Sequence, residues 1–378
     1  AIVHKNKLYF ACGTDFERFD GSAWTTGLAL SGTAQPTRYF LEWDAKLFIL
    51  SNAGELKYTS DNDQGVLWVV HAKSSLEAGM FTSLFNYRND AGTILPHLGT
   101  KIGVFILDYE DEKWQETELV FPQHDFACRG ATRWREAAYI PVGTGVYRYQ
   151  VSTEPVGVLP MGPDRDYGLP AAYKGNIVKL LGEHNALFAL VSAASASDYS
   201  VLLKWNGKGW AVVKTGATVG KAMSAAYIGT PDGNYRLWFG ADAKVFYIPL
   251  KVDLQNPLEL TAHPYATRGT HTWPWFDADN AVVDKILFRV SAYLDDTSAT
   301  EYVMLYYGVG YDEDTWTLLS NTDFSDGKID ADGETSFSLV AGEGLSFKAI
   351  RVKAEFYRGS TTTVSPDLRW LRIDYIKL

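Results

Sequence analysis

Tryptophan returns at nearly constant intervals along the first two thirds of this chain. Trp24, Trp68 and Trp114 are separated by 44 and 46 residues, and Trp210 follows after 96, about two further intervals. Each of these tryptophans ends a segment with the same sequence of features. An apolar run is followed by a small or polar turn, a second run and a short Asp/Asn/Gly-rich turn. The segments are KLYFACGTDFERFDGSAW (7–24), KLFILSNAGELKYTSDNDQGVLW (46–68), KIGVFILDYEDEKW (101–114) and ALFALVSAASASDYSVLLKWNGKGW (186–210). Because one such unit cannot bury both of its faces, copies of it must stack on one another.

The repeated unit is made of strands. Helical periodicity is nearly absent, and Tyr (22), Phe (19) and Trp (12) far outnumber Met (4), a bias typical of pleated strands. About four strands every 45 residues or so is the period of a β-propeller blade. We therefore predict an all-β chain in which residues 1–258 form a β-propeller of five or six blades. Trp24, Trp68, Trp114 and Trp210 are predicted to pack between neighbouring blades. The first repeated unit starts without its innermost strand. We therefore predict that a strand from another part of the chain completes this blade and closes the ring.

The pattern changes after residue 258. Residues 259–284, rich in Pro, Thr and His, are predicted to be an interdomain linker, and residues 285–378 a second domain of longer strands. In the segment 345–357, apolar residues mostly alternate with Lys348, Arg351, Lys353 and Glu355, which is typical of a half-buried antiparallel strand. Predicted strands at 285–294, 301–310, 335–342, 345–357 and 368–378 indicate a jelly-roll-like β-sandwich.

The order of the two parts, with particular residues at the two ends of the second one, resembles structural proteins of tailed bacteriophages. The matching residues are Trp275, Phe276, Asp277 and Lys285 at its start, and Ser365, Pro366, Leu368, Leu371, Ile373 and Tyr375 at its end. The resemblance implies a non-enzymatic virion component of the tail, neck or fibres. It would act by assembly with other virion proteins, as a symmetric homo-oligomer, with a host-surface glycan as a candidate ligand. It names no catalytic residue.

Charge and hydropathy exclude several classes of protein. The net charge is −10 and the pI about 5.2, which disfavours a nucleic-acid-binding protein that grips phosphates. No run of about 18 apolar residues occurs, so no membrane span is predicted. The chain begins without Met, which fits removal of an upstream segment.

The sequence contains no enzyme or metal motif, so no catalytic residue, metal or cofactor is predicted. Cys12 and Cys128 are 116 residues apart, and the seven histidines lack metal-site spacing. Acidic runs at 108–112 and 312–314 are interpreted as solvated turns. Residues 61–68 approximate the Asp-box of sialidases, with Asp61 where Ser belongs. The acidic group Asp326, Asp330, Asp332 and Glu334 could supply oxygen ligands to calcium, although it has no EF-hand pattern.

Two alternative functions remain open. A carbohydrate-binding protein would present an exposed aromatic platform, and Trp273 and Trp275 are the candidate ligand or interface contacts. The simpler interpretation of this pair is packing of one domain on the other. A sialidase-like glycoside hydrolase would need three arginines converging on a carboxylate; the chain offers Arg133, Arg135, Arg148 and Arg236. Other propeller glycosidases would place two carboxylates about 5 to 9.5 Å apart.

Overall fold

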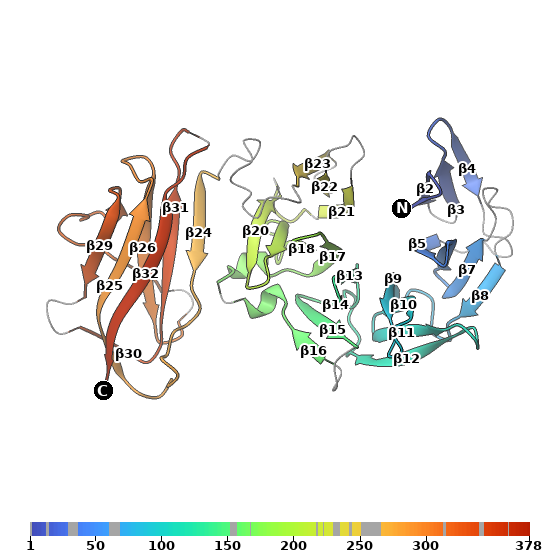
Figure 1. Ribbon diagram of the computed structural model, residues 1–378, viewed down its shortest axis with the longest axis horizontal. Coiled ribbons are helices and arrows are strands. Elements are labelled where there is room, and N and C mark those ends of the chain that lie inside the picture. Colours follow the sequence, from blue (N-terminus) through green and yellow to red (C-terminus); the bar gives the residue numbers. More distant parts are fainter. Residues whose placement is uncertain are drawn as a thin grey trace. The chain divides into compact units, whose positions relative to one another are not determined.

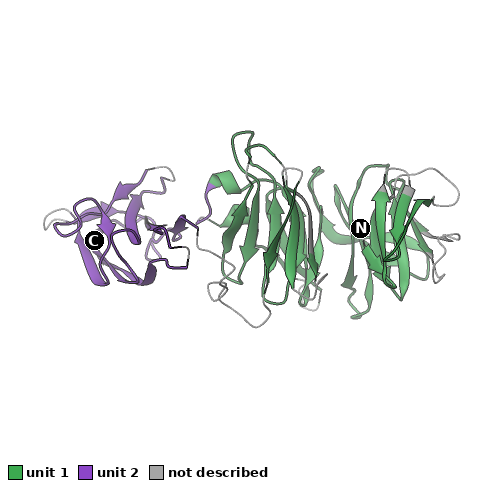
Figure 2. Ribbon diagram, turned by 90° about the horizontal axis from the view of Figure 1, so that it is seen from above, with its two compact units in different colours: residues 1–166, 171–250 green, residues 167–170, 251–378 purple. Residues whose placement is uncertain are grey.

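The computed structural model describes residues 2–12, 15–28, 37–59, 69–151, 157–166, 168–216, 218–221, 223–229, 235–241, 244–250, 266–312, 315–339, 344–361 and 363–378. This part of the chain is nearly all β, with two short 3-10 helices, η1 (Pro163–Arg165) and η2 (Ala171–Tyr173). It divides into two compact units, which Figure 2 colours separately: residues 1–166 with 171–250, and residues 167–170 with 251–378. Asp61 to Trp68, the Asp-box-like segment, lies outside the described residues.

The first unit contains six antiparallel sheets that follow one another along the chain (Figure 1). Sheet A has β1 (Ile2–His4), β2 (Lys7–Cys12), β3 (Asp15–Phe19) and β4 (Trp24–Leu28). Sheet B has β5 (Thr37–Trp43), β6 (Lys46–Ser51), β7 (Glu55–Thr59) and β8 (Val69–Lys73). Sheet C has β9 (Phe81–Arg88), β10 (Ile94–Thr100), β11 (Gly103–Asp108) and β12 (Lys113–Val120).

The next three sheets continue the series. Sheet D has β13 (Thr132–Trp134), β14 (Ala137–Val142), β15 (Gly145–Gln150) and β16 (Gly157–Pro160). Sheet E has β17 (Ile177–Gly182), β18 (Leu187–Val191), β19 (Val201–Trp205) and β20 (Trp210–Thr215). Sheet F has β21 (Met223–Gly229), β22 (Arg236–Ala241) and β23 (Lys244–Pro249). Several four-stranded antiparallel sheets in sequence are consistent with a propeller-like fold.

Successive sheets contact each other through their first strands. β1 contacts β5, β5 contacts β9, β9 contacts β13, β13 contacts β17, and β17 contacts β21. Apolar clusters fill the junctions: Phe16 with Leu47 between sheets A and B, Leu50 with Leu98 between B and C, Tyr87 with Ile140 between C and D, and Phe188 with Phe239 between E and F. Sheets D and E meet through β17, which contacts β13 and β14. From A to F, each sheet therefore lies against the next one, as the repeat requires.

The first sheet differs from the prediction. It was expected to lack its innermost strand, but β1 pairs with β2 from Ile2↔Tyr9 to His4↔Lys7 and gives sheet A four strands. Within the described residues, sheet F is the one with three. The run Ile2–His4 is too short to show a period, so its strand is visible only once its partner is known.

Side chains at the ends of the first strands bind the backbone of the neighbouring sheet. The Trp43 indole donates to Ile94 O at 2.8 Å, from sheet B to sheet C, and the Trp134 indole donates to Glu183 O, from D to E. Tyr87 connects sheets C and D by donating to Glu136 O at 3.1 Å. A tight turn follows Trp43 and Trp134, with positive φ at Asp44, Ala45 and Arg135. We call these side chains the inter-sheet latches.

The second unit has two sheets (Figure 1). Sheet G has β24 (Arg268–Thr272), β26 (Tyr302–Val309), β27 (Thr317–Leu318), β28 (Lys328–Ile329) and β31 (Ile350–Tyr357). Sheet H has β25 (Lys285–Asp295), β29 (Gly333–Ser338), β30 (Leu345–Phe347) and β32 (Asp367–Lys377). One core lies between them, with Val290 and Phe337 from sheet H and Leu305 and Ala354 from sheet G.

The predicted segment boundaries shift in this unit. The expected linker 259–284 contains β24, which pairs with β31 from Arg268↔Tyr357 to Thr272↔Lys353 and so belongs to sheet G. Its five residues, bordered by Pro-containing sequence, are too few to show a strand period. The single strand expected over 345–357 is two: β30 joins sheet H and β31 joins sheet G. The chain therefore changes sheets at residues 348–349.

The residues behind the phage-protein resemblance hold the second unit together. Lys285 is fully buried, and its ammonium donates to Asn280 O (2.6 Å), Val283 O (2.8 Å) and Lys348 O (2.9 Å). Phe276 exchanges backbone hydrogen bonds with Ile350. Leu368, Leu371, Ile373 and Tyr375 pack against the core. These residues of the phage-protein resemblance therefore have a structural role, because they attach the two ends of the second unit to its sheets.

Candidate binding face on sheet G

The outer face of sheet G gathers aromatic and charged side chains from three strands. Along β31, Val352, Ala354 and Phe356 turn toward the core, so Arg351, Lys353, Glu355 and Tyr357 turn outward. The strand register sets Arg268 of β24 opposite Tyr357, and Tyr302 and Tyr306 of β26 opposite Tyr357 and Lys353. We call this surface, together with Trp275 and Trp316, the aromatic–cation face.

Arg351 lies between two indole rings. Its guanidinium carbon is 4.5 Å from the Trp275 ring centroid and 4.4 Å from that of Trp316, and the residue is only 4% exposed. It also donates to Asp312 O at 3.3 Å. Arginine suits this place because its flat, weakly hydrated cation stacks on rings. Gly308, directly opposite Arg351, leaves room for Trp316: a Cβ there would lie 3.7 Å from the ring and 3.1 Å from Thr315 O.

The alternation continues along β31 with Lys353. Its ammonium lies 4.8 Å from the Trp316 centroid and 4.2 Å from that of Tyr306. It also forms an ion pair with Glu355 at 3.0 Å. Each ring therefore lies beside a cation, and the order Trp275, Arg351, Trp316, Lys353, Tyr306 forms a continuous row.

Glu355 is the acidic centre of the face. It accepts hydrogen bonds from Tyr357 (2.9 Å) and Arg268, in addition to the pair with Lys353. Burial opposes its ionisation, but the hydrogen bonds from Lys353, Tyr357 and Arg268 outweigh burial and hold its pKa below the ordinary value. Burial, followed by the adjacent Glu355 carboxylate, raises the pKa of Tyr357 to about 12. Tyr357 therefore stays a hydrogen-bond donor at neutral pH.

The far end of the face is also aromatic. Tyr357 stacks on Tyr302 with ring centroids 4.6 Å apart and an interplanar angle of 14°. Lys328 lies 5.5 Å from the Tyr302 centroid and pairs with Asp326 at 3.2 Å. The face has four cations, Arg268, Lys328, Arg351 and Lys353, against the two carboxylates Glu355 and Asp326, although the whole chain has a net charge of −10. Ring faces and fixed cations are suited to binding a ligand that has both apolar ring surface and negative charge.

The two tryptophans singled out from the sequence separate. Trp275 belongs to the aromatic–cation face and also contacts Tyr311, with ring centroids 5.2 Å apart. Trp273 packs against the core of the second unit, and its backbone N–H donates to Val352 O at 2.9 Å. Sequence reasoning missed Trp316, and it predicted a half-buried strand over 345–357, in which the polar side would face outward. Arg351 and Glu355 are in fact 4% and 6% exposed, because neighbouring side chains cover them.

The four regularly spaced tryptophans differ in their surroundings. Trp210 is 6% exposed; its indole donates to Met161 O at 2.8 Å and its backbone N–H to Asp166 at 2.7 Å, which connects sheet E to the segment after sheet D. Trp114 is half-buried against the cluster between sheets B and C. Trp24 departs from the prediction: it is 53% exposed and contacts Phe19 of its own sheet. Trp68 lies outside the described residues.

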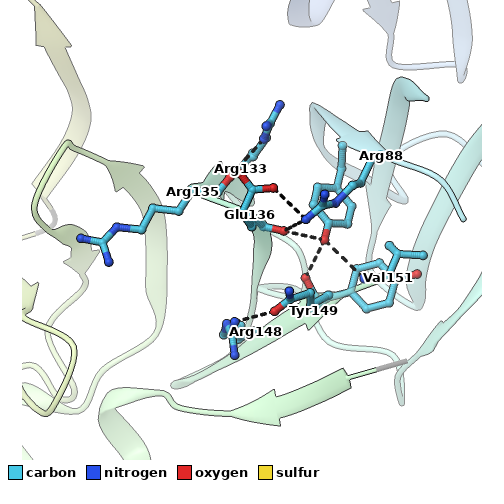
Figure 3. Close-up of polar contacts among 9 residues, drawn as sticks. Arg88, Arg133, Arg135, Glu136, Arg148, Tyr149 and Val151 are labelled. Atoms are coloured by element: carbon cyan, nitrogen blue, oxygen red, sulfur yellow. Dashed lines mark hydrogen bonds and ion pairs between the residues drawn. The ribbon is translucent and has the colours of Figure 1, made fainter. Parts of the chain in front are cut away.

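The arginines considered for a sialidase-like centre do not converge. Figure 3 shows Arg133, Arg135 and Arg148 pointing in different directions. Arg148 donates to Gln150, and Arg133 donates to Arg135 O at 3.3 Å. Arg236 lies over Tyr247 of sheet F, 4.2 Å from the ring centroid. The ion pair between Arg88 and Glu136 in Figure 3, at 2.8 Å, instead joins sheet C to sheet D.

The acidic groups accept hydrogen bonds from protein donors where the structure describes them. Asp108 caps a turn by accepting the backbone N–H groups of Glu110 and Asp111. Asp332 accepts two hydrogen bonds from Thr297, one from its backbone N–H and one from its hydroxyl. Over the described ranges, no group of three or more His, Cys, Asp or Glu is placed to hold a metal ion. No helix in this part of the chain is long and apolar enough to cross a membrane. Cys128 is buried, and burial raises its thiol pKa to about 12.

Comparison with known proteins identifies no family. No protein-family model and no curated protein matches the chain. Among solved structures, YCF48 from Cyanidioschyzon merolae is similar at 11% identity, with 62% of this chain and 74% of that chain covered and a TM-score of 0.41. An ancestral GH74 enzyme is similar at 13% identity (65% and 35%, TM-score 0.43), as is the computationally designed Ika8 protein at 12% (66% and 70%, 0.41). At these TM-scores the likeness carries no conclusion about activity, ligand or partner.

Proposed function

We propose that the chain is a structural component of a tailed-bacteriophage particle, associated with the tail, neck or fibres. In this proposal, sheets A to F are the blades of a six-bladed β-propeller and the second unit is a jelly-roll-like β-sandwich. The contacts of each first strand with the next, and the inter-sheet latches, support the propeller assignment. Two sheets packed around one core, as in the second unit, serve as a rigid support for a binding surface.

The observation that carries the recognition role is the aromatic–cation face. We propose that it binds an acidic saccharide of the host surface, with the Trp and Tyr rings against the sugar and Arg268 and Lys353 near its carboxylate or phosphate groups. The stacked cations hold the rings in fixed positions, which lowers the conformational entropy lost on binding. This is the carbohydrate-binding alternative placed on sheet G.

Glycan-array binding of the full chain tests the recognition role. Wild type is expected to bind acidic glycans and to leave their neutral counterparts unbound. Trp316→Ala removes the ring shared by Arg351 and Lys353, and is expected to weaken binding at least tenfold. Trp24→Ala is the matched control, because it removes an exposed indole from the first unit. A blank array, or equal losses in the two variants, would contradict the role of this face.

The virion role needs a separate measurement. Particles banded from a lysate of a host carrying the gene are expected to contain the chain in a fixed ratio to the other structural proteins, by quantitative mass spectrometry. Immunogold labelling is expected at the tail or neck. Recovery of the chain only in the soluble fraction would overturn the virion assignment and leave the binding face untouched.

A further inference from the structure

The strand β32 leaves one side of sheet H unpaired. It runs for 11 residues, Asp367–Lys377, and pairs with the central strand β25 along almost its whole length. β29 and β30 occupy the other side of β25. Within the described ranges no strand pairs with the outer edge of β32. Exposed edges of this length readily add a further strand, so proteins usually cover or interrupt them.

The outward side chains of β32 follow a simple order. Leu371, Ile373 and Tyr375 pack against the core, which leaves Trp370, Arg372, Asp374 and Ile376 on the outer face. Trp370 and Ile376 are 38% and 48% exposed. Asp374 pairs with Arg372 and with Arg289 of β25, each at 3.2 Å. Two apolar residues therefore border a central pair of opposite charges.

We propose that β32 pairs antiparallel with β32 of a second copy of the chain, in the register centred on Ile373. A twofold axis perpendicular to the sheet pairs outward side chains with outward side chains. The axis must therefore lie midway between the two copies of one residue, which then face each other. Centred on Ile373, Arg372 faces the partner's Asp374, and Trp370 faces the partner's Ile376. Both the charges and the exposed apolar side chains are then matched across the axis.

Neighbouring registers lack this match. If the pairing is centred on Arg372, the two copies of Arg372 face each other and repel. If it is centred on Asp374, the two Asp374 carboxylates face each other and repel. The register centred on Ile373 does bring the partner's Lys377 toward Arg369, the extra residue where the pairing of β32 with β25 shifts register. Arg369, however, already pairs with Asp295 (2.8 Å), and the Lys377 ammonium donates to Ala278 O (2.8 Å), so each cation is held within its own chain.

A charge exchange on the full chain tests the register. Wild type is expected to dimerise in sedimentation equilibrium. Arg372→Asp sets two carboxylates against each other, and Asp374→Arg sets two guanidinium groups, so each is expected to weaken the dimer at least tenfold. The double variant R372D/D374R restores opposite charges in this register alone, and is expected to recover dimerisation. A monomeric wild type, or single variants that dimerise like wild type, would overturn the proposal.

Cross-linking supplies a second readout that does not depend on charge. In the double variant W370C/I376C each cysteine faces its counterpart across the axis, and oxidation is expected to give a covalent dimer. Either single variant has no facing cysteine, and is expected to stay monomeric on a denaturing gel. Cross-linking of the single variants as efficient as that of the double variant would contradict the register. Glycan binding is measured separately, so failure of this interface leaves the proposed recognition role to its own test.

Discussion

Trp210 offers the sharpest test of how neighbouring sheets are held together. The side chain is 6% exposed, so folding removes about 200 Å² of it from water, worth about 5 kcal/mol at about 25 cal/mol per Å². Trp210→Ala forfeits most of this, typically about 3 to 5 kcal/mol. It also leaves Met161 O without its indole donor, at a cost of about 1 kcal/mol. We expect the local unfolding free energy to fall by about 4 to 6 kcal/mol.

The assay should resolve the sheets, because a chain of two units need not unfold in one step. Hydrogen exchange of the full chain, measured by mass spectrometry, is expected to show lost protection in β16, β19 and β20 of Trp210→Ala and unchanged protection in the second unit. Trp210→Phe keeps an aromatic ring but lacks the N–H, and should cost about 1 to 2 kcal/mol. Trp24→Ala, at 53% exposure, removes about half as much buried area and should cost about 2 kcal/mol. Equal effects at Trp24 and Trp210 would refute the reasoning.

Three further predictions follow from buried groups. Burial lowers the pKa of His97 to about 4, so below pH 6.5 the unfolded chain binds a proton that the folded chain does not. The free energy of unfolding should therefore fall by about 3 kcal/mol between pH 6.5 and 4. In His97→Gln, the urea midpoint should depend less steeply on pH over this range. Cys128, with its thiol pKa raised to about 12, should resist alkylation at pH 8 until the chain unfolds, which peptide mapping would detect; rapid labelling of the native protein would contradict its burial. Lys285→Met leaves three carbonyl oxygens without their donor and should destabilise the second unit by several kcal/mol in thermal unfolding, whereas unchanged stability would mean that the buried ammonium is dispensable.

The repeat was visible in the sequence because strand length and turn chemistry are local properties. The inter-sheet contacts were not, since regular spacing selected Trp24, which is exposed, and passed over Trp43 and Trp134, which bind neighbouring sheets. A signal did exist for the latter two. Each is the last residue of a first strand and precedes a turn with positive φ, and a ring held at that point reaches the next sheet.

The candidate binding face was predictable in part. The alternation around Arg351 and Lys353 predicted one strand over 345–357, and β31 forms its second part, while the first three residues belong to β30. The sequence could not show that Trp275 and Trp316, 41 residues apart, enclose the same guanidinium, because that contact depends on how β24, β26 and β31 are ordered in sheet G. Pairing across a sheet is set by tertiary packing, which single-sequence periodicity does not encode.

The most direct test of the recognition role uses the indole rings themselves. With 5-fluorotryptophan incorporated, the twelve tryptophans report separately by fluorine NMR, and Trp275→Phe and Trp316→Phe assign two of the signals. On titration with an acidic oligosaccharide, the Trp275 and Trp316 resonances are expected to shift together and to saturate, while those of Trp24 and Trp210 stay in place. Saturable shifts confined to tryptophans of the first unit would show that the ligand binds elsewhere and would contradict the account.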